Sequence, residues 1–121
     1  MYAGTGLGDG DVFGDRPDEY LVGYECDGAH FDRADLEAGR PVTPTGRDGT
    51  PADFRILAVG DTRPAGYGFG NAAATMGLHR PGGTVFTAST TDWVRGLESS
   101  SAVGRITRNV LDRLSAPSSG G

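Results

Sequence analysis

The sequence predicts an α/β fold in which helices cover an open sheet in three layers. The first observation is a pair of glycines followed by the apolar run 84–88, which has the length and β-branched composition of a buried strand. Hydroxyl side chains at 89–91 can then cap a helix in which Trp93, Val94 and Leu97 repeat at helical spacing. A strand, a tight crossing and a helix form the repeating unit of such a sheet.

Three earlier runs have the composition of strands of the same sheet. Residues 20–25 form the first expected strand, with Glu25 on one face and Cys26 on the other. Residues 54–60 are apolar for most of their length, which is typical of a parallel strand covered on both faces. Residues 72–79 are mostly small and form the third expected strand, so the run 84–88 becomes the fourth.

Two further stretches have the pattern of helices. Residues 31–38 predict a short helix that is capped by Asp32 and turns Leu36 inward. A serine run at 99–101 can cap the last helix, whose apolar side chains make one continuous stripe that we expect to be buried. The stripe consists of Val103, Ile106, Val110, Leu111 and Leu114.

The composition divides the chain into three parts. Residues 1–19 are rich in glycine and aspartate and predict an irregular loop segment, whereas 20–114 carry the strand and helix patterns of one α/β domain. Residues 115–121 consist mainly of serine and glycine and predict a disordered tail.

Charge, cysteine content and hydropathy exclude several classes of function. The net charge of −5 argues against nucleic-acid binding. A single cysteine allows no internal disulfide and no Cys-x-x-Cys metal site. No apolar run approaches the roughly 20 residues of a membrane span, and the first residues lack the pattern of a signal peptide. We therefore expect a cytoplasmic chain with no nucleic-acid or membrane partner.

Two motifs resemble cofactor sites but do not match their templates. The acidic stretch 9–20 has Tyr20 at the position where a calcium-binding loop needs a bidentate glutamate. The glycines of 66–70 are not followed by the Lys-Ser or Lys-Thr pair of a phosphate loop. We therefore expect this chain to hold no metal and no cofactor by itself.

The candidate catalytic residues are Glu25, Asp27 and His79. Glu25 is expected at the carboxyl end of a strand, where ligands bind in open α/β sheets, and it could exchange protons there. The alternative for Glu25 is an ion pair with an arginine. Cys26 could be a nucleophile with His79 or His30 as its base, although a buried and unreactive thiol explains a lone cysteine equally simply.

Six phrases of the sequence occur in a definite order. They are LVGYECDG at 21–28, TPADFRILA at 50–58, TMGL at 75–78, GGTVF at 82–86, TTDW at 90–93 and RITRNVL at 105–111. Together they resemble the C-terminal domain of the large (beta) subunit of N,N-dimethylformamidase and its relatives. The resemblance extends from about residue 8 to residue 114.

This resemblance implies a fold, an activity and a role for one residue. The fold would be the latter part of a class I glutamine-amidotransferase-like domain, which is flavodoxin-like. Enzymes of this family hydrolyse small N-substituted formamides at a mononuclear iron held by tyrosine and carboxylate side chains. Glu25 matches the glutamate that assists proton transfer. The resemblance places the iron ligands upstream, so we expect this chain to hold no iron and to be inactive alone.

The short length of the chain leaves the partner open. As a fragment, it would expose a sheet edge that could associate with the missing upstream part, with a small subunit or with a second copy. One alternative is a non-catalytic binding or assembly module that uses this edge. A further alternative is a small cysteine hydrolase with Cys26 as nucleophile and His79 as base.

Overall fold

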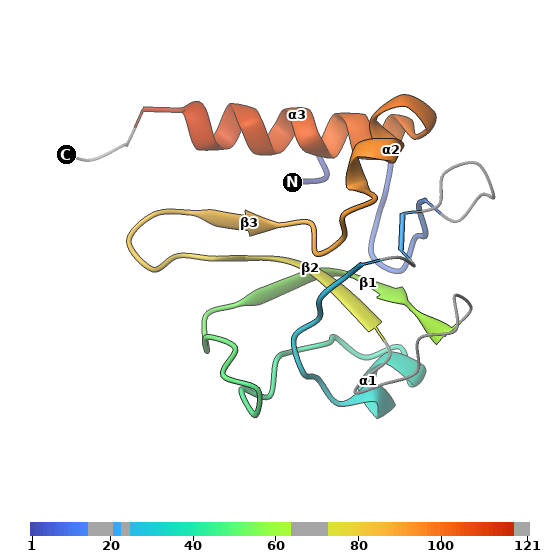
Figure 1. Cartoon of the computed structure of the whole chain (residues 1–121), viewed down its shortest axis with the longest axis vertical. Coiled ribbons are helices and arrows are strands. Elements are labelled where there is room, and N and C mark those ends of the chain that lie inside the picture. Colours follow the sequence, from blue (N-terminus) through green and yellow to red (C-terminus); the bar gives the residue numbers. More distant parts are fainter. Residues whose placement is uncertain (15–20, 23–24, 64–72, 118–121) are drawn as a thin grey trace. The chain divides into compact units, whose positions relative to one another are not determined.

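The structure of the chain is an α/β arrangement of a three-stranded antiparallel sheet and helices (Figure 1). It is a computed structural model that describes residues 1–14, 21–22, 25–63 and 73–117. The chain forms two units, which we call the terminal unit (Met1–Tyr20 with Val94–Gly121) and the sheet unit (Leu21–Trp93). Two earlier expectations, the glycine loop at 66–70 and the end of the tail at 118–121, lie outside the described residues.

The sheet consists of β1 (Arg55–Asp61), β2 (Ala73–His79) and β3 (Val85–Thr87), with β2 in the middle. These three strands were expected from their composition and are confirmed within one or two residues. The expectation of parallel pairing is wrong, because both described pairs are antiparallel. The connection from β2 to β3 spans only residues 80–84, which is too short for the crossover that a parallel pair needs.

The central strand β2 is buried along most of its length. Residues 74–77 are buried in succession, so both faces of the strand are covered. Gly77 is required here because a Cβ atom at this position would collide with the ring of Phe54 and the carbonyl oxygen of Arg55. The small residues of β2 therefore match a strand that other segments approach closely from both sides.

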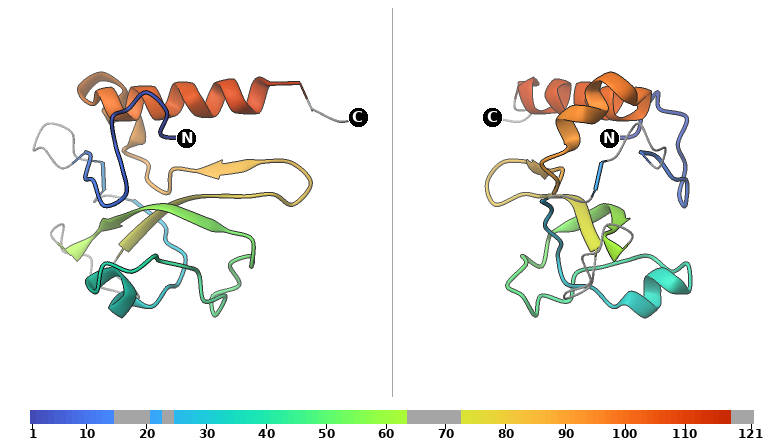
Figure 2. Two further views of the ribbon diagram at one scale, coloured as in Figure 1. Left: turned by 180° about the vertical axis from the view of Figure 1, so that it is seen from behind. Right: turned by 45° about the vertical axis from the view of Figure 1, so that its right-hand side comes forward.

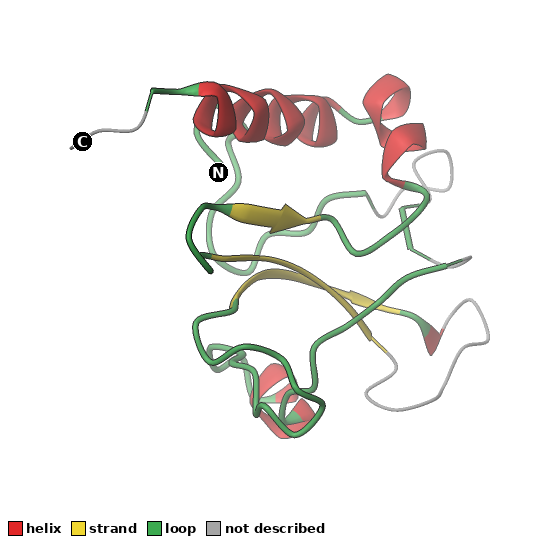
Figure 3. Ribbon diagram, turned by 60° about the vertical axis from the view of Figure 1, so that its left-hand side comes forward, coloured by secondary structure: helices red, strands yellow, loops and turns green. Residues whose placement is uncertain are grey.

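The N-terminal part of the sheet unit contains one short helix and many loops (Figure 3). Helix α1 (Arg33–Glu37) has Asp32 as its N-cap, as expected, and the Asp32 carboxylate accepts a hydrogen bond from Ala34 N at 3.0 Å. Leu36 is only half-buried. An ion pair of 3.4 Å between Arg33 and Asp61 connects α1 to the end of β1.

The strand expected at 20–25 is absent from the residues of this stretch that the structure describes. Leu21, Val22 and Glu25 belong to no strand, whereas 20, 23 and 24 lie outside the described part. The carbonyl groups of Leu21 and Glu25 accept hydrogen bonds from a threonine-rich turn instead of from a neighbouring strand. Among the described residues of this stretch, ladder pairing is limited to the isolated bridge of Cys26 with Thr90, and the Leu21 carbonyl is bound by the Thr90 side chain.

The terminal unit is built around α3 (Ser101–Ser115), which follows α2 (Trp93–Ser99). Ser100 is the N-cap of α3, as the serine run predicted, and its hydroxyl accepts a hydrogen bond from Val103 N at 3.3 Å. The N-terminal segment lies beside α3, where Asn109 Nδ2 donates to the carbonyls of Met1 and Ala3 (Figure 2). Neither α2, α3 nor α1 is long and apolar enough to cross a membrane.

The apolar stripe of α3 is buried over only part of its length. Val103, Ile106 and Val110 are buried as expected, but Leu111 and Leu114 are 58% and 48% exposed, so the expectation of one continuous buried stripe is wrong. Among the described residues, the bonds from α3 to the N-terminal segment extend only as far as Asn109. The last turn of the helix lies beyond these bonds.

Trp93 packs against the ring of Phe86. Trp93 begins α2 and belongs to the sheet unit. Its ring meets that of Phe86 in β3 edge to face, with 6.4 Å between the ring centroids. This arrangement is favourable for aromatic pairs and holds Trp93 against β3.

Partial burial of the α3 stripe predicts unequal effects of truncation. Ile106→Ala should lower the free energy of unfolding by about 2–5 kcal/mol, because it leaves a cavity at a fully buried position. Leu111→Ala, on the same helix, should change it by no more than about 0.5 kcal/mol. Urea unfolding followed by far-ultraviolet circular dichroism measures both. Equal effects of the two substitutions would contradict the burial pattern.

Candidate functional site

Three segments that are distant in sequence meet at one point of the sheet unit, which we call the three-segment junction (Asp27, Thr75 and Ser89). Asp27 N donates to Ser89 O at 3.0 Å, and Thr75 N donates to Asp27 O at 3.1 Å. Ser89 Oγ closes the ring by donating to Thr75 O at 2.5 Å. Thr75 Oγ1 also accepts a bond from Ala29 N at 2.8 Å. The segment from Asp27 to Ala29 is thereby bound to β2 beyond the point where β3 ends.

The turn that follows β3 holds the segment that contains Glu25. Cys26 and Thr90 form an isolated antiparallel bridge. Thr91 donates to the carbonyl of Glu25 with both its N–H, at 3.0 Å, and its Oγ1, at 3.3 Å. The neighbouring Thr90 donates through Oγ1 to Leu21 O at 2.5 Å. The main chain on both sides of Cys26 is therefore anchored by consecutive residues of this turn.

Backbone geometry at the junction is demanding at two positions. Ser89 has φ of +59°, the left-handed conformation that costs a residue other than glycine about 1–2 kcal/mol. Its N–H and its Oγ both lie 3.2 Å from Thr87 Oγ1, which helps to hold this conformation. Gly28 leaves no room for a Cβ atom, because the carbonyl oxygen of Ala73 occupies that space.

The carboxylates of Glu25 and Asp27 are exposed at the edge of this junction. They stand on either side of Cys26, the residue that forms the isolated bridge with Thr90. Neither carboxylate forms a hydrogen bond or an ion pair with any residue that the structure describes. The arginine partner considered for Glu25 is thus not found within residues 1–14, 21–22, 25–63 and 73–117.

His79 lies away from the two carboxylates. Asp27 is bonded to Thr75, and His79 is four residues further along β2, which corresponds to about 13 Å along a strand. The His79 ring lies 6.3 Å from that of Phe54, and its Nδ1 is buried without a hydrogen-bond partner among the described residues. Glu25 and Asp27 are thus close only as near neighbours in sequence, and the structure does not bring His79 to them.

The two histidines considered as bases for the Cys26 thiol are not placed to act on it. Cys26 is half-buried and adjacent to Asp27, so the separation from His79 applies to its thiol as well. The ring of His30 is engaged by Thr45, with 2.6 Å between Nδ1 and Oγ1. Neither histidine is positioned by its observed contacts as a base for this thiol.

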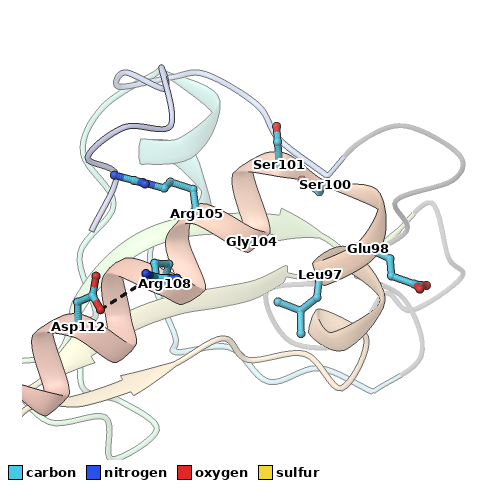
Figure 4. Close-up of a pocket in the computed structure, with 8 residues that line it drawn as sticks. All are labelled: Leu97, Glu98, Ser100, Ser101, Gly104, Arg105, Arg108 and Asp112. Carbon is cyan, nitrogen blue, oxygen red and sulfur yellow. Dashed lines mark ion pairs between the residues drawn. The ribbon is translucent and has the colours of Figure 1, made fainter.

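An open groove of about 630 Å³ lies along α2 and α3 in the terminal unit (Figure 4). Three of its lining residues are already engaged, because Arg105 Nε donates to Ala3 O at 3.3 Å and Arg108 pairs with Asp112 at 3.7 Å. None of the candidate catalytic residues lines this groove. The lining residues are Leu97, Glu98, Ser100, Ser101, Gly104, Arg105, Arg108 and Asp112.

Two exposed carboxyl groups of the sheet unit have a strongly lowered pKa. Hydrogen bonds from Arg63 hold the pKa of Asp61 at about 2, and the charges of Arg63 and Arg33 act in the same direction. Hydrogen bonds from Thr50 and from the backbone of His30 hold the pKa of Asp48 at about 2. Both groups stabilise local structure in their ionised form and are unsuited to proton exchange near neutral pH.

The sequence pattern did not indicate the role of Thr75 and of the hydroxyl residues at 89–91. The latter were interpreted as helix caps, and Thr90 Oγ1 does accept a bond from Asp92 N at 3.2 Å. Their larger role is to bind the segment 21–27 and β2, which lie far away in sequence. The number of hydroxyl residues could have indicated this role. One hydroxyl residue suffices to cap a helix, but three follow β3.

Comparisons with protein-family models, with curated proteins and with solved structures find no match to this chain. Within the described residues, no group of three or more histidine, cysteine, aspartate or glutamate side chains could hold a metal ion. The site is thus defined by geometry alone, as two exposed carboxylates on a segment anchored through its main chain.

The left-handed conformation of Ser89 predicts an unusual order of substitutions. Ser89→Ala removes the bond to Thr75 O and keeps the strained backbone, whereas Ser89→Gly removes the same bond but tolerates a positive φ. The alanine variant should therefore be less stable than the glycine variant by about 1 kcal/mol. Thermal unfolding of both proteins tests this. A glycine variant less stable than the alanine variant would show that strain at this position is unimportant.

The lowered pKa of Asp61 predicts a dependence of stability on acid. The folded pKa of about 2 lies below the ordinary value of about 3.9, so the ionised group stabilises the fold above pH 4 and this contribution disappears as the pH falls toward 2. Asp61→Asn should lower stability at pH 7 by at most about 1 kcal/mol, since the group is exposed. Urea unfolding at pH 7 and pH 2 should give a difference only at pH 7.

Proposed function

We propose that this chain is the C-terminal portion of a dimethylformamidase-like amidohydrolase and that it supplies the glutamate that assists proton transfer. Its substrates would be small N-substituted formamides. The chain would be inactive alone, because the iron ligands of such an enzyme would come from upstream. The observation that carries this proposal is the meeting of three phrases of the resemblance, 21–28, 75–78 and 90–93, around one junction.

The placement of Glu25 supports the role assigned to it. Its carboxylate is exposed and forms no bond with the described residues, so it is available to a substrate or to another part of the enzyme. Its main-chain carbonyl is bound twice by Thr91, so the backbone from which the side chain extends is fixed. An available carboxylate on a fixed backbone suits a general acid–base group.

The described residues do not fit the iron of this family, since they contain no group of three potential ligands. No role toward the metal is therefore proposed for the described residues. The part proposed for the chain is limited to the carboxylate of Glu25, which would accept or deliver a proton as the amide bond of the substrate breaks.

The same proposal assigns the chain to a flavodoxin-like fold of the amidotransferase type. The three described strands would be the antiparallel margin of a larger, flavodoxin-like sheet of the amidotransferase type, with further strands and a third layer contributed upstream. Support comes from β2, which is buried at four consecutive positions, as expected for a strand inside a covered sheet.

A second candidate is a non-catalytic assembly module that joins a partner chain through a sheet edge. The observation in its favour is the order β1-β2-β3, which leaves β1 and β3 as the outer strands among those described. The partner would be the upstream part of the enzyme, a small subunit or a second copy of this chain. This candidate requires association but no proton transfer by Glu25.

Substitution of Glu25 tests the proposed function. In a dimethylformamidase-like enzyme whose C-terminal portion is replaced by residues 21–114, Glu25→Gln should lower kcat for dimethylformamide by about 100-fold or more. Iron content and thermal stability should stay nearly unchanged, because the shape of the side chain is retained. Glu98→Gln, at an exposed glutamate of α2, is the matched control and should leave kcat unchanged. An unchanged rate with Glu25→Gln would overturn the proposal.

The isolated chain distinguishes the two candidates further. We expect the purified 121-residue chain to show no formamide hydrolysis, with or without added ferrous iron. Hydrolysis by this chain would disprove the claim of inactivity. Light scattering after size-exclusion chromatography tests the assembly module, which requires a dimer or a complex with the upstream part or the small subunit. A monomer that binds neither the upstream part nor the small subunit would disprove the assembly module.

A further inference from the structure

Thr91 makes the most direct contact with the residue on which the proposed function depends. Both of its donors, the N–H at 3.0 Å and Oγ1 at 3.3 Å, bind the same acceptor, the carbonyl oxygen of Glu25. Thr91 itself is exposed and contributes little to the core. A bridge between two segments needs only one N–H donor for this carbonyl oxygen. The hydroxyl of Thr91 is therefore an additional donor.

The neighbours of Thr91 give this contact its rigidity. Ser89 receives the N–H of Asp27 and binds Thr75 O in β2, and Thr90 binds Leu21 O. The turn is therefore fixed to the central strand before it reaches Glu25. A displacement of the turn at residue 91 would move the Glu25 backbone, whereas β2 and Asp27 would remain bonded to each other.

From this geometry we infer that Thr91 is a positioning residue for Glu25 and acts through the Glu25 main-chain carbonyl. This inference rests on the proposed function, because it assumes that the Glu25 carboxylate exchanges protons with a substrate. The hydroxyl of Thr91 does not touch the substrate. It narrows the positions that the Glu25 side chain can occupy, and small displacements of a catalytic group lower the rate strongly.

Three variants of the enzyme that carries residues 21–114 test the inference. Thr91→Val keeps the shape of the side chain and removes the hydroxyl, and it should lower kcat by about tenfold while KM changes less than about twofold. Thr91→Ser restores the hydroxyl and should recover most of the lost rate. Thr43→Val is the matched control, since Thr43 is an exposed threonine of the same unit without a hydrogen bond to the described residues, and kcat should not change.

A double substitution separates positioning from a merely structural role. Thr91→Val should lower kcat no further when Glu25→Gln is already present, because the positioned carboxylate is then absent. Equal losses in both backgrounds, or a wild-type rate with Thr91→Val, would overturn the inference while a slow Glu25→Gln enzyme keeps the proposed function intact. An unaffected rate with Glu25→Gln would overturn the proposed function and this inference with it.

Hydrogen exchange in the isolated 121-residue chain provides a readout that is independent of activity. In the unaltered chain, the amides of Asp27 and Thr91 should both exchange slowly, since they donate to Ser89 O and Glu25 O. With Thr91→Val, exchange at position 91 should become faster while exchange at Asp27 stays slow. Unchanged exchange at both positions would show that the hydroxyl does not hold Glu25 and would overturn the inference.

Discussion

The sheet unit depends on the ring of hydrogen bonds that joins Asp27, Thr75 and Ser89. Each residue donates to the next, so the segment before α1, the central strand and the turn after β3 share one junction. Two of the three bonds join main-chain groups, and the third uses the Ser89 hydroxyl. Because Thr75 is almost completely buried, its N–H and its carbonyl need partners inside the protein, and loss of the bond from Ser89 would leave the Thr75 carbonyl unsatisfied.

The same junction explains why the two exposed carboxylates differ from the other acids of the unit. Asp61 is bound by Arg63, and Asp48 is bound by Thr50 and by the backbone of His30, and these bonds lower the pKa of each carboxyl group to about 2. Glu25 and Asp27 are held through their main chains, so their carboxylates form no bond with the described residues. Anchoring through the main chain is how a protein can fix a side chain in place and leave its chemistry available.

Sequence patterns predicted the local elements well. The compositions of β1, β2 and β3 identified these strands within one or two residues, and Asp32 and Ser100 were recognised as the N-caps of α1 and α3. These features depend on neighbouring residues, so the sequence carries them directly. The apolar stripe of α3 correctly indicated which face of the helix is buried. It did not indicate that Leu111 and Leu114 remain exposed, because periodicity does not give the length over which that face is covered.

What the sequence by itself determined is the strands β1 to β3, the helices α1 to α3, the capping residues and the presence of acidic candidates near 25–27. Only the tertiary structure decided that the strands pair in antiparallel order, that the carbonyl of Glu25 binds Thr91 and that His79 lies about 13 Å along β2 from the residue bonded to Asp27. The physical reason is the distance along the sequence over which each interaction acts. Helix caps and strand composition act over a few residues, whereas the bond from Thr91 to Glu25 spans 66 positions and leaves no local trace in the sequence.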